Sequence, residues 1–342
     1  MHTRDYTFAQ KKGACIFDAS FAEIEKYAEK DHIVIITDEE VFRCHQSKMA
    51  GYTVLQVPPG EAHKNQPTID RIIGQLLEFE TDKQACIIGV GGGVVTDMAG
   101  FVASIYKRGV RLGLVPTTIM GMADAAIGGK NGINAGLYKN MIGTICQPDF
   151  ILYDYSFLDT LPVKEWINGF AEVIKHACIR DAVLFSMLER FSLHDVQADR
   201  TLVAELVERN VAIKLDIVLE DEFEKADRKL LNFGHTFGHA IENLHQLPHG
   251  HAISIGMVAA CILSEKMNDL HFADAQRVVK LLAKYHLPVD IETDHRKVFE
   301  VLKLDKKRMD DQIHFVLLNK IGHAEAKPVR LDYLEAHIKE LL

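Results

Sequence analysis

The stretch that decides the fold is residues 86–97, which read CIIGVGGGVVTD. Its opening, CIIGV, is a short apolar run typical of a buried strand, and the residues that follow the stretch, MAGFVA, continue as a helix. The glycines between them let backbone N–H groups approach an anion closely, and the start of a helix adds a favourable partial charge. The stretch therefore predicts a strand, a turn that can bind a pyrophosphate, and a helix.

This glycine-rich turn differs from the two common phosphate-binding fingerprints. Its spacing is not GxGxxG, and it lacks the Lys-Ser/Thr pair of an ATP-binding P-loop. A tight turn also needs glycine for purely conformational reasons. Three consecutive glycines between a strand and a helix nevertheless favour dinucleotide binding.

Short apolar runs and helical patterns alternate through the first half of the chain. Strands are expected at 33–36, 53–57, 86–90 and 112–115, a turn that opens a helix at 37–40, and a helix at 68–79. This rhythm predicts a Rossmann-like parallel sheet, on which ligands bind beyond the carboxyl ends of the strands. Residues 122–140 show no obvious long helix or strand, and such a segment in a compact domain is usually functional or mobile.

The second half is predicted to be mainly helical. Helical patterns cover 164–179, 182–191, 198–219, 234–244, 253–267 and 273–285, and prolines separate several of them. We therefore expect an α/β fold with two domains, a Rossmann-like domain at 1–160 and a mainly α-helical domain at 161–342. The cleft between the two domains is the expected place of a small-molecule site.

Composition and charge restrict the class of protein. The chain has 342 residues, of which 48% are apolar and 25% charged, as in ordinary soluble globular proteins. The net charge of -9 argues against broad nucleic-acid binding but not against an anionic substrate held by local lysines. The six cysteines are scattered without a CxxC pair, and neither a signal peptide nor a membrane span is apparent. We expect a cytoplasmic protein with reduced thiols.

Histidines gather in residues 232–239, NFGHTFGH, and 249–251, HGH. His235 and His239 are four apart and so share one face of a helix. Imidazole is the commonest protein ligand for a borderline divalent metal, and Glu172 in AEVIKH (171–176) offers an acidic partner. An isolated histidine is more often a surface or hydrogen-bonded structural residue, whereas this cluster, set among small residues, favours a metal site.

Two lysines lie among glycines and asparagines in the first half of the chain. Lys130 follows Gly128-Gly129, and Lys139 precedes Asn140. Most lysines are simply solvated, but this setting favours groups that bind an anion.

Taken in order, these motifs resemble the 3-dehydroquinate synthase family of sugar phosphate cyclases. The matching segments are GGGVVTDMAGF, YKRG, VPTT, GGKNGIN, KNMIG, GFAEVIKH, LLNFGHTFGHAIE and HGHA, and the likeness extends from Gly60 to Lys307. The resemblance implies an NAD-binding N-terminal domain, a helical metal- and substrate-binding C-terminal domain, and a homodimer. It implies tightly held NAD, a divalent metal that is commonly zinc and can be cobalt, and a small anionic sugar-phosphate substrate. The implied reaction converts 3-deoxy-arabino-heptulosonate 7-phosphate into 3-dehydroquinate and phosphate.

The resemblance also implies roles for individual residues. Glu172, His235 and His249 match the metal ligands. The substrate pocket and its charged groups match Asp124, Lys130, Lys175, Lys214, Arg228, Asn232, His239 and Lys306, with Lys307 as the alternative to Lys306. Arg108 matches an arginine that reaches the substrate phosphate of the neighbouring subunit. Cofactor contacts match Asp38, Glu61, Lys64, Gly92, Gly93, Val94, Val95, Asp97, Thr117, Thr118, Lys130, Lys139, Phe157, Leu158, Asp159 and Thr160.

The chain departs from the family pattern at a few positions. Ala125 and Ala126 stand where the family commonly has two serines, Asn131 where it has threonine, and His251 where it has glutamate after His-Gly. His251 could be a harmless neighbour, an altered support of the metal site, or an extra ligand.

Three other functions therefore remain open. One is a different cyclase, such as one acting on sedoheptulose 7-phosphate, although such relatives typically have a proline-containing sequence in place of FGH at 237–239. Another is a metal-dependent polyol or glycerol phosphate dehydrogenase, against which the Glu172 and Lys175 motif argues. The third is a paralogue that binds NAD and metal without turnover.

Overall fold

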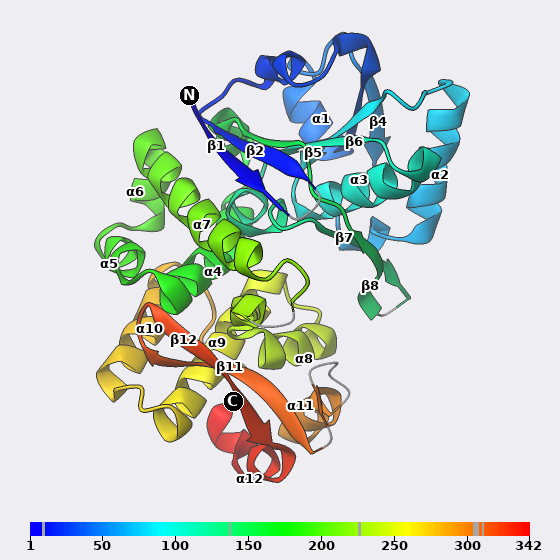
Figure 1. Cartoon of the computed structure of the whole chain (residues 1–342). Helices are drawn as coiled ribbons and strands as arrows, with labels where there is room; N and C mark the ends of the chain where they lie inside the picture. Colours follow the sequence, from blue (N-terminus) through cyan, green and yellow to red (C-terminus); the bar gives the residue numbers. More distant parts are fainter. Residues whose placement is uncertain (9–10, 137, 225–226, 304–307, 310) are drawn as a thin grey trace. The chain divides into compact units, whose positions relative to one another are not determined.

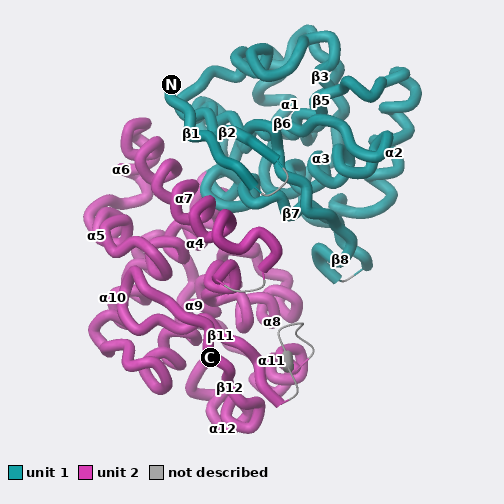
Figure 2. Tube along the Cα trace, viewed as in Figure 1, with its two compact units in different colours: residues 1–162 teal, residues 163–342 magenta. Residues whose placement is uncertain are grey.

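The structure, a computed structural model, describes residues 1–342 except 9–10, 137, 225–226, 304–307 and 310. The chain divides into two compact units, Met1–Pro162 (unit 1) and Val163–Leu342 (unit 2), which Figure 2 shows in different colours. The sequence analysis placed the change from alternating strands and helices to helices alone near residue 160.

Unit 1 is built on a seven-stranded sheet, which confirms the predicted α/β class. Its strands, in spatial order, are β1 (His2–Thr7), β2 (Lys12–Phe17), β9 (Phe150–Tyr153), β6 (Arg111–Pro116), β5 (Cys86–Gly91), β3 (Ile33–Asp38) and β4 (Thr53–Val57). Among the described strands of this sheet, β1 and β2 pair antiparallel and the other neighbours pair parallel. The four predicted strands form β3, β4, β5 and β6, whereas the sequence analysis did not predict β1, β2 or β9.

Helices α1 (Glu39–His45), α2 (Gln66–Glu78) and α3 (Gly93–Ile105) connect or cover these strands (Figure 1). The predicted turn at 37–40 does open a helix, because the Asp38 carboxylate caps α1 by accepting from the amides of Glu40 and Val41 at 3.0 and 2.9 Å. Gly89 lets α3 pack closely on β5, since a Cβ there would lie 2.7 Å from the Cβ of Ala99.

The expectation that residues 122–140 hold neither a strand nor a long helix is wrong. β7 (Lys130–Ala135) and β8 (Tyr138–Ile145) pair as an antiparallel hairpin. Gly143 allows the two strands to approach, because a Cβ there would lie 2.4 Å from the carbonyl oxygen of Asn131. The segment is rich in glycine and asparagine, residues depleted in strands, which explains why the sequence pattern concealed it.

Unit 2 is mainly helical, as predicted. Its helices are α4 (Val163–Arg180), α5 (Ala182–Arg190), α6 (Leu193–Ala198), α7 (Arg200–Glu220), α8 (His235–His245), α9 (His249–Met267), α10 (Phe272–Lys284), α11 (His295–Leu302) and α12 (Leu331–Leu341). A small antiparallel sheet of β10 (Arg308–Met309), β11 (Gln312–Lys320) and β12 (His323–Arg330) was not anticipated.

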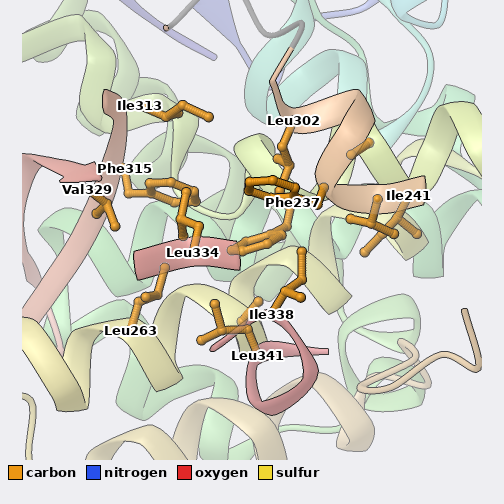
Figure 3. Close-up of a cluster of buried hydrophobic side chains, with 14 of the residues drawn as sticks. Phe237, Ile241, Leu263, Leu302, Ile313, Phe315, Val329, Leu334, Ile338 and Leu341 are labelled. Atoms are coloured by element: carbon orange, nitrogen blue, oxygen red, sulfur yellow. The ribbon is translucent and has the colours of Figure 1, made fainter. Parts of the chain in front are cut away.

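This small sheet is needed to complete the core of unit 2. Side chains of β11 and β12 pack with those of α8, α9, α11 and α12 in one buried cluster, ten members of which are labelled in Figure 3. The rings of Phe237 and Phe315 join α8 to β11, with centroids 5.3 Å apart. Burial of an apolar side chain contributes about 1.5–3 kcal/mol, so this cluster anchors α8 and α9, the two helices that carry His235 and His249.

Helices α8 and α9 cross with their backbones in contact. A Cβ on Gly256 would lie 2.0 Å from the carbonyl oxygen of Gly234 and 2.7 Å from the amide nitrogen of Gly238. Gly234 itself has a φ of 78°, a conformation that favours glycine. The glycines around His235 therefore serve the close approach of the two helices.

Two further observations concern the cysteines and the apolar character of the helices. Each of the six cysteines, all within the described residues, is a free thiol. Among those same residues no helix has both the length and the apolar character needed to cross a bilayer.

Two helical glycines should respond oppositely to substitution by alanine. Gly256→Ala should lower the free energy of unfolding by about 1–3 kcal/mol, because the new methyl group overpacks the α8–α9 crossing. Gly74→Ala in α2 has open space around the new Cβ and should raise stability by about 0.5–1 kcal/mol. Chemical denaturation of both variants tests this; equal effects at the two positions would contradict the close crossing.

Candidate functional site

Helix α4 presents Glu172 and Lys175 on one face, three residues apart. Their side chains form an ion pair and are 1% and 2% exposed. A buried charge is tolerated when it is paired or binds a metal, because desolvation is otherwise expensive. The candidate site in unit 2 is built around this buried pair.

Two histidines from other helices converge on the Glu172 carboxylate. The Nε2 atom of His235, the first residue of α8, lies 3.7 Å from Oε1 of Glu172. The Nε2 atom of His249, the first residue of α9, lies 3.5 Å from the same oxygen. The rings of His235 and His249 have centroids 5.5 Å apart. The structure therefore brings together the three residues that the resemblance implied as metal ligands.

Hydrogen bonds at the opposite ring nitrogens orient both imidazoles. Nδ1 of His235 lies 3.1 Å from the carbonyl oxygen of Phe233, and Nδ1 of His249 lies 3.3 Å from Oε2 of Glu242. A carbonyl or carboxylate oxygen can only accept, so each Nδ1 donates. In the neutral imidazole the lone pair is then on Nε2, the atom directed at Glu172.

The spacing of these atoms fits a divalent metal. Ligands about 2.1 Å from a tetrahedral zinc lie roughly 3.4 Å from one another. The two nitrogen–oxygen distances are 3.5 and 3.7 Å, and ligand atoms from all three residues lie within 4.8 Å of one another. Three protein ligands also leave a position open for a substrate oxygen, as a catalytic metal requires.

Burial and the nearby carboxylates shift the pKa values of the two imidazoles in opposite directions. Burial holds the pKa of His235 well below its ordinary value, although Glu172 opposes the shift. Burial would likewise lower the pKa of His249, but hydrogen bonds to Glu172 and Glu242 raise it to about 9. Without a metal, burial thus favours the neutral imidazole at His235, whereas the two carboxylates favour a proton on His249. A bound divalent cation would displace that proton and supply positive charge in its place.

Buried cations coincide with predicted site residues. Among the lysines and arginines whose side chains the structure describes, four are buried, namely Lys64, Lys175, Lys214 and Arg228. Lysine and arginine are almost never fully buried without a partner or a task. Three of the four, on α4, α7 and the 3-10 helix Asp227–Asn232, belong to unit 2.

The remaining site predictions in unit 2 have varied surroundings. The Asn232 amide donates to Oε1 of Glu224 at 3.0 Å. His239 is exposed, and its ring centroid lies 5.2 Å from that of His235. His251 is half-buried and belongs to none of the groupings of candidate ligand atoms found among the described residues. Lys306 and its alternative Lys307 lie outside the described residues.

In unit 1, many of the predicted cofactor contacts follow the carboxyl ends of three neighbouring strands. Residue 37 of β3 pairs with residue 90 of β5, and residue 91 of β5 pairs with residue 116 of β6. Asp38, Gly92 and Thr117 therefore leave the same edge of the sheet side by side. That edge is where open parallel sheets bind nucleotides. Burial raises the pKa of Asp38, although the amides of Val41 and Glu40 oppose the shift.

The N-terminus of α3 is arranged to receive an anion. α3 begins at Gly93, and its N-cap, Gly92, offers no side-chain cap to the first amides. Free amides and the helix dipole favour a phosphate at such an end. A Cβ on Gly92 would lie 3.0 Å from Thr118, and one on Gly93 would lie 3.1 Å from Ala125. The glycines therefore also permit close packing, and Ala125 occupies the space beside Gly93. Val94 and Val95 belong to the first turn of α3.

A hydrogen-bonded network links the predicted cofactor residues near the hairpin. Lys64 donates to Oδ2 of Asp97 at 2.5 Å and to Oδ1 of Asn140 at 2.6 Å. The Asn134 amide donates to Glu61 at 2.8 Å and accepts from the backbone amide of Asn140 at 2.8 Å. Asn134 thus ties the segment around Glu61 and Lys64 to the β7–β8 hairpin.

Other predicted residues of unit 1 are placed as follows. Phe157 and Leu158 are buried in the 3-10 helix Tyr155–Thr160, and Phe157 belongs to the core, so that turn can offer a ligand its backbone, Asp159 and Thr160. Thr160 bonds His45 at 2.7 Å. Lys130, Lys139 and Arg108 are exposed, and Asp124 is half-buried. The expected site in a cleft between the two units stays a prediction.

Asn131, one of the departures from the family pattern, has a structural explanation. Its buried amide donates to the carbonyl oxygens of Gly129 and Cys146 at 2.7 and 3.0 Å. A Cβ on Gly100 would lie 1.8 Å from its Oδ1, so the amide is packed directly against α3. This asparagine therefore closes the hairpin.

Sequence reasoning missed several residues that support the site, namely Glu242, Asn134 and Asn168. Glu242 stood in a quoted motif, but nothing in the sequence signals that its carboxylate meets the Nδ1 atom of His249. The other two lie far in sequence from their partners. A helical wheel could have placed Glu242 beside His239, three residues away on α8.

The structure thus combines a Rossmann-like sheet with a helical unit that carries a candidate metal centre, and comparison with known proteins gives the family. Family models match the chain as 3-dehydroquinate synthase N-terminal at residues 54–168 and 3-dehydroquinate synthase C-terminal at residues 169–308. A 3-dehydroquinate synthase from Campylobacter concisus (strain 13826) is 37% identical over 327 residues, which cover 93% of each chain. The chain belongs to the 3-dehydroquinate synthase family.

Solved structures of related enzymes share the fold over nearly the whole chain. The 2-epi-5-epi-valiolone synthase from Streptomyces hygroscopicus subsp. jinggangensis 5008, with NAD+ and Zn2+ bound, is 27% identical, with a TM-score of 0.89 and 99% of each chain covered. A 2-deoxy-scyllo-inosose synthase complexed with carbaglucose-6-phosphate, NAD+ and Co2+ is 24% identical, with a TM-score of 0.88 and full coverage of both chains. The latter likeness concerns the fold alone.

The Glu242 contact predicts a specific defect in metal binding. Glu242→Gln keeps the shape of the side chain but removes the charge that orients His249, so the dissociation constant for Zn2+ should rise about ten- to a hundredfold. Chelator competition measures this constant directly. Glu340→Gln, whose carboxylate pairs with Lys266 on the surface, is the matched control and should leave the constant unchanged. An unchanged constant in the Glu242 variant would show that the contact does not support the metal site.

Proposed function

We propose that the protein converts 3-deoxy-arabino-heptulosonate 7-phosphate into 3-dehydroquinate and phosphate. The overall reaction comprises a transient oxidation by NAD, elimination of phosphate, re-reduction and an internal aldol closure. The observation that carries the proposal is the convergence of Glu172, His235 and His249 in a chain of this family. The buried cations of unit 2 support it, because the substrate is anionic.

The proposed cofactors are NAD and a divalent metal, zinc or its substitute cobalt. The valiolone synthase holds NAD+ and Zn2+, and the inosose synthase holds NAD+ and Co2+. Glu172, His235 and His249 would hold the metal. The uncapped start of α3, with Asp38 and Thr117 beside it, would hold the dinucleotide. We assign the remaining cofactor-contacting residues named in the sequence analysis to the same dinucleotide.

The residues of unit 2 indicate how the chain can assist this chemistry. When bound, NAD supplies reversible hydride transfer and the metal supplies Lewis acidity. The Lys175 ammonium, buried against Glu172, offers hydrogen bonds and positive charge to a substrate oxygen that loses its proton. Lys214 and Arg228 add fixed cations that can neutralise the phosphate and carboxylate of the substrate. We assign Asn232, His239, Asp124, Lys130 and Lys306 to the substrate as well.

Departures from the family pattern were reasons to keep other functions open, and the structure gives Asn131 and Ala125 local roles. Asn131 bonds within the hairpin, and Ala125 packs beside Gly93. His251, another departure, follows His249 by two residues on α9, and side chains so spaced do not face each other on a helix. These contacts account for Asn131 and Ala125 within the fold, so neither residue by itself argues for a different substrate.

Turnover assays of the purified protein test the proposed reaction. With NAD, zinc and 3-deoxy-arabino-heptulosonate 7-phosphate, we expect release of one phosphate per carbocyclic product and no net NADH, because the hydride returns to the substrate. Exhaustive chelation should abolish turnover and added zinc should restore it. Full activity after metal removal would contradict the ligand assignment.

The same assay separates the alternative functions. Phosphate release from sedoheptulose 7-phosphate alone would indicate a different cyclase. Accumulation of NADH with a polyol or glycerol phosphate would indicate a dehydrogenase. Binding of NAD and metal without turnover of any candidate would indicate a non-catalytic paralogue.

We further propose that the protein acts as a cytoplasmic homodimer in which Arg108 serves the partner's substrate. Arg108 is exposed and has a φ of 61°, in a turn where Lys83 donates to the carbonyl oxygen of Lys107 at 2.8 Å. Large apolar side chains are exposed on β8, among them Tyr138 and Met141 at 71% and 49%. An exposed apolar patch is common at protein interfaces, which supports self-association.

Mixed dimers test whether Arg108 acts across an interface. Arg108→Ala and Lys130→Ala subunits should each be nearly inactive alone, because each removes one charge from every site. Hybrid dimers contain one site with both defects and one site with neither, so activity should recover to about half of wild type for each verified hybrid. Absence of recovery, with hybrid formation shown by native mass spectrometry, would count against a shared site.

A further inference from the structure

Asn168 connects the two helices that carry Glu172 and His249. It lies on α4 four residues before Glu172, and the two side chains share one face of that helix. Its Oδ1 atom accepts a hydrogen bond of 2.6 Å from the backbone amide of Gly250. Gly250 follows His249 directly in the first turn of α9.

The start of α9 needs this hydrogen bond. The N-cap of α9 is Pro248, which provides no side-chain cap for the first amides of the helix. Uncapped amides at a helix start are usually satisfied by a side chain or by water. Asn168, 82 positions away in the sequence, supplies the acceptor instead.

The same contact leaves no space between the two helices. A Cβ on Gly250 would lie 2.0 Å from the carbonyl oxygen and 2.8 Å from the carbonyl carbon of Asn168. The first turn of α9 therefore rests on the backbone of α4. His249 directly precedes this contact on α9, and Glu172 follows it by one turn on α4. The contact therefore fixes the distance between the two backbone positions from which these side chains project.

We infer that Asn168 is a positioning residue for the metal centre, setting the separation of Glu172 and His249. A working metal site holds its ligands within about 0.5 Å of the required geometry. Glu242 orients the ring of His249, whereas Asn168 fixes the backbone from which that ring projects. This role rests on the metal site of the proposed function. It adds Asn168, one helical turn before Glu172 on α4, to the residues that support that site.

The role can be tested with cobalt, whose visible absorption reports the geometry of its ligands. Asn168→Leu keeps the branched shape of the side chain but removes the acceptor, and the dissociation constant for Co2+ should rise about tenfold or more, with a changed visible spectrum. Asn168→Asp keeps an acceptor at a helix N-terminus, where negative charge is favoured, and should bind Co2+ as tightly as wild type with the same spectrum.

Ser264→Ala is the matched control for general loss of stability. Ser264 is buried on α9, where its hydroxyl donates to Ala260 at 2.6 Å and accepts from the amide of Leu318 at 2.9 Å. Its loss should lower the unfolding midpoint without changing the cobalt affinity or spectrum. If Asn168→Leu does not fold, Asn168→Ala, which adds no apolar bulk, takes its place with the same expected result.

Two sets of outcomes keep this inference separate from the proposed function. Wild-type cobalt affinity and spectrum in a folded Asn168→Leu or Asn168→Ala variant would overturn the positioning role while leaving the metal site intact. Failure of the wild-type protein to bind Co2+, or equal binding by Glu172→Gln, would overturn the metal site itself.

Discussion

The site in unit 2 depends on one constraint, the burial of the Glu172 carboxylate between a lysine and two imidazoles. A carboxylate that is 1% exposed is stable only if positive charge surrounds it. Lys175 provides that charge on one side, and the Nε2 atoms of His235 and His249 approach Oε1 on the other. The three candidate ligands therefore lie where a positive charge besides that of Lys175 is favourable. This is the electrostatic condition for holding a divalent cation.

The fold of unit 2 maintains this arrangement through contacts that no single segment could provide. Gly256, two turns into α9, lets the start of α8 lie directly against that helix. The cluster in Figure 3 holds both helices against the small sheet. Glu242 and Phe233 orient the rings, and Asn168 holds the first turn of α9 on α4. Each of these supports acts on the backbone or the ring of a ligand, so the metal site is preorganised by the surrounding structure.

The sequence predicted the parts of the structure that local patterns encode. The strands that became β3 to β6 are short apolar runs, and most helices of unit 2 show clear periodicity. The β7–β8 hairpin was not predicted, because its glycines and asparagines are atypical of strands. Strands β11 and β12 were not predicted either. The ligand set came from resemblance to a family. The supports Glu242 and Asn168 could not be predicted in the same way, because their roles arise only when α4, α8 and α9 meet.

The central claim is that one cation is held by Glu172, His235 and His249. Crystals of the zinc-loaded protein, with diffraction recorded on both sides of the zinc absorption edge, test it most directly. The account predicts an anomalous peak about 2.0–2.2 Å from a Glu172 oxygen and from the Nε2 atoms of both histidines. A peak at any other set of side chains, or none at full zinc occupancy in solution, would contradict it.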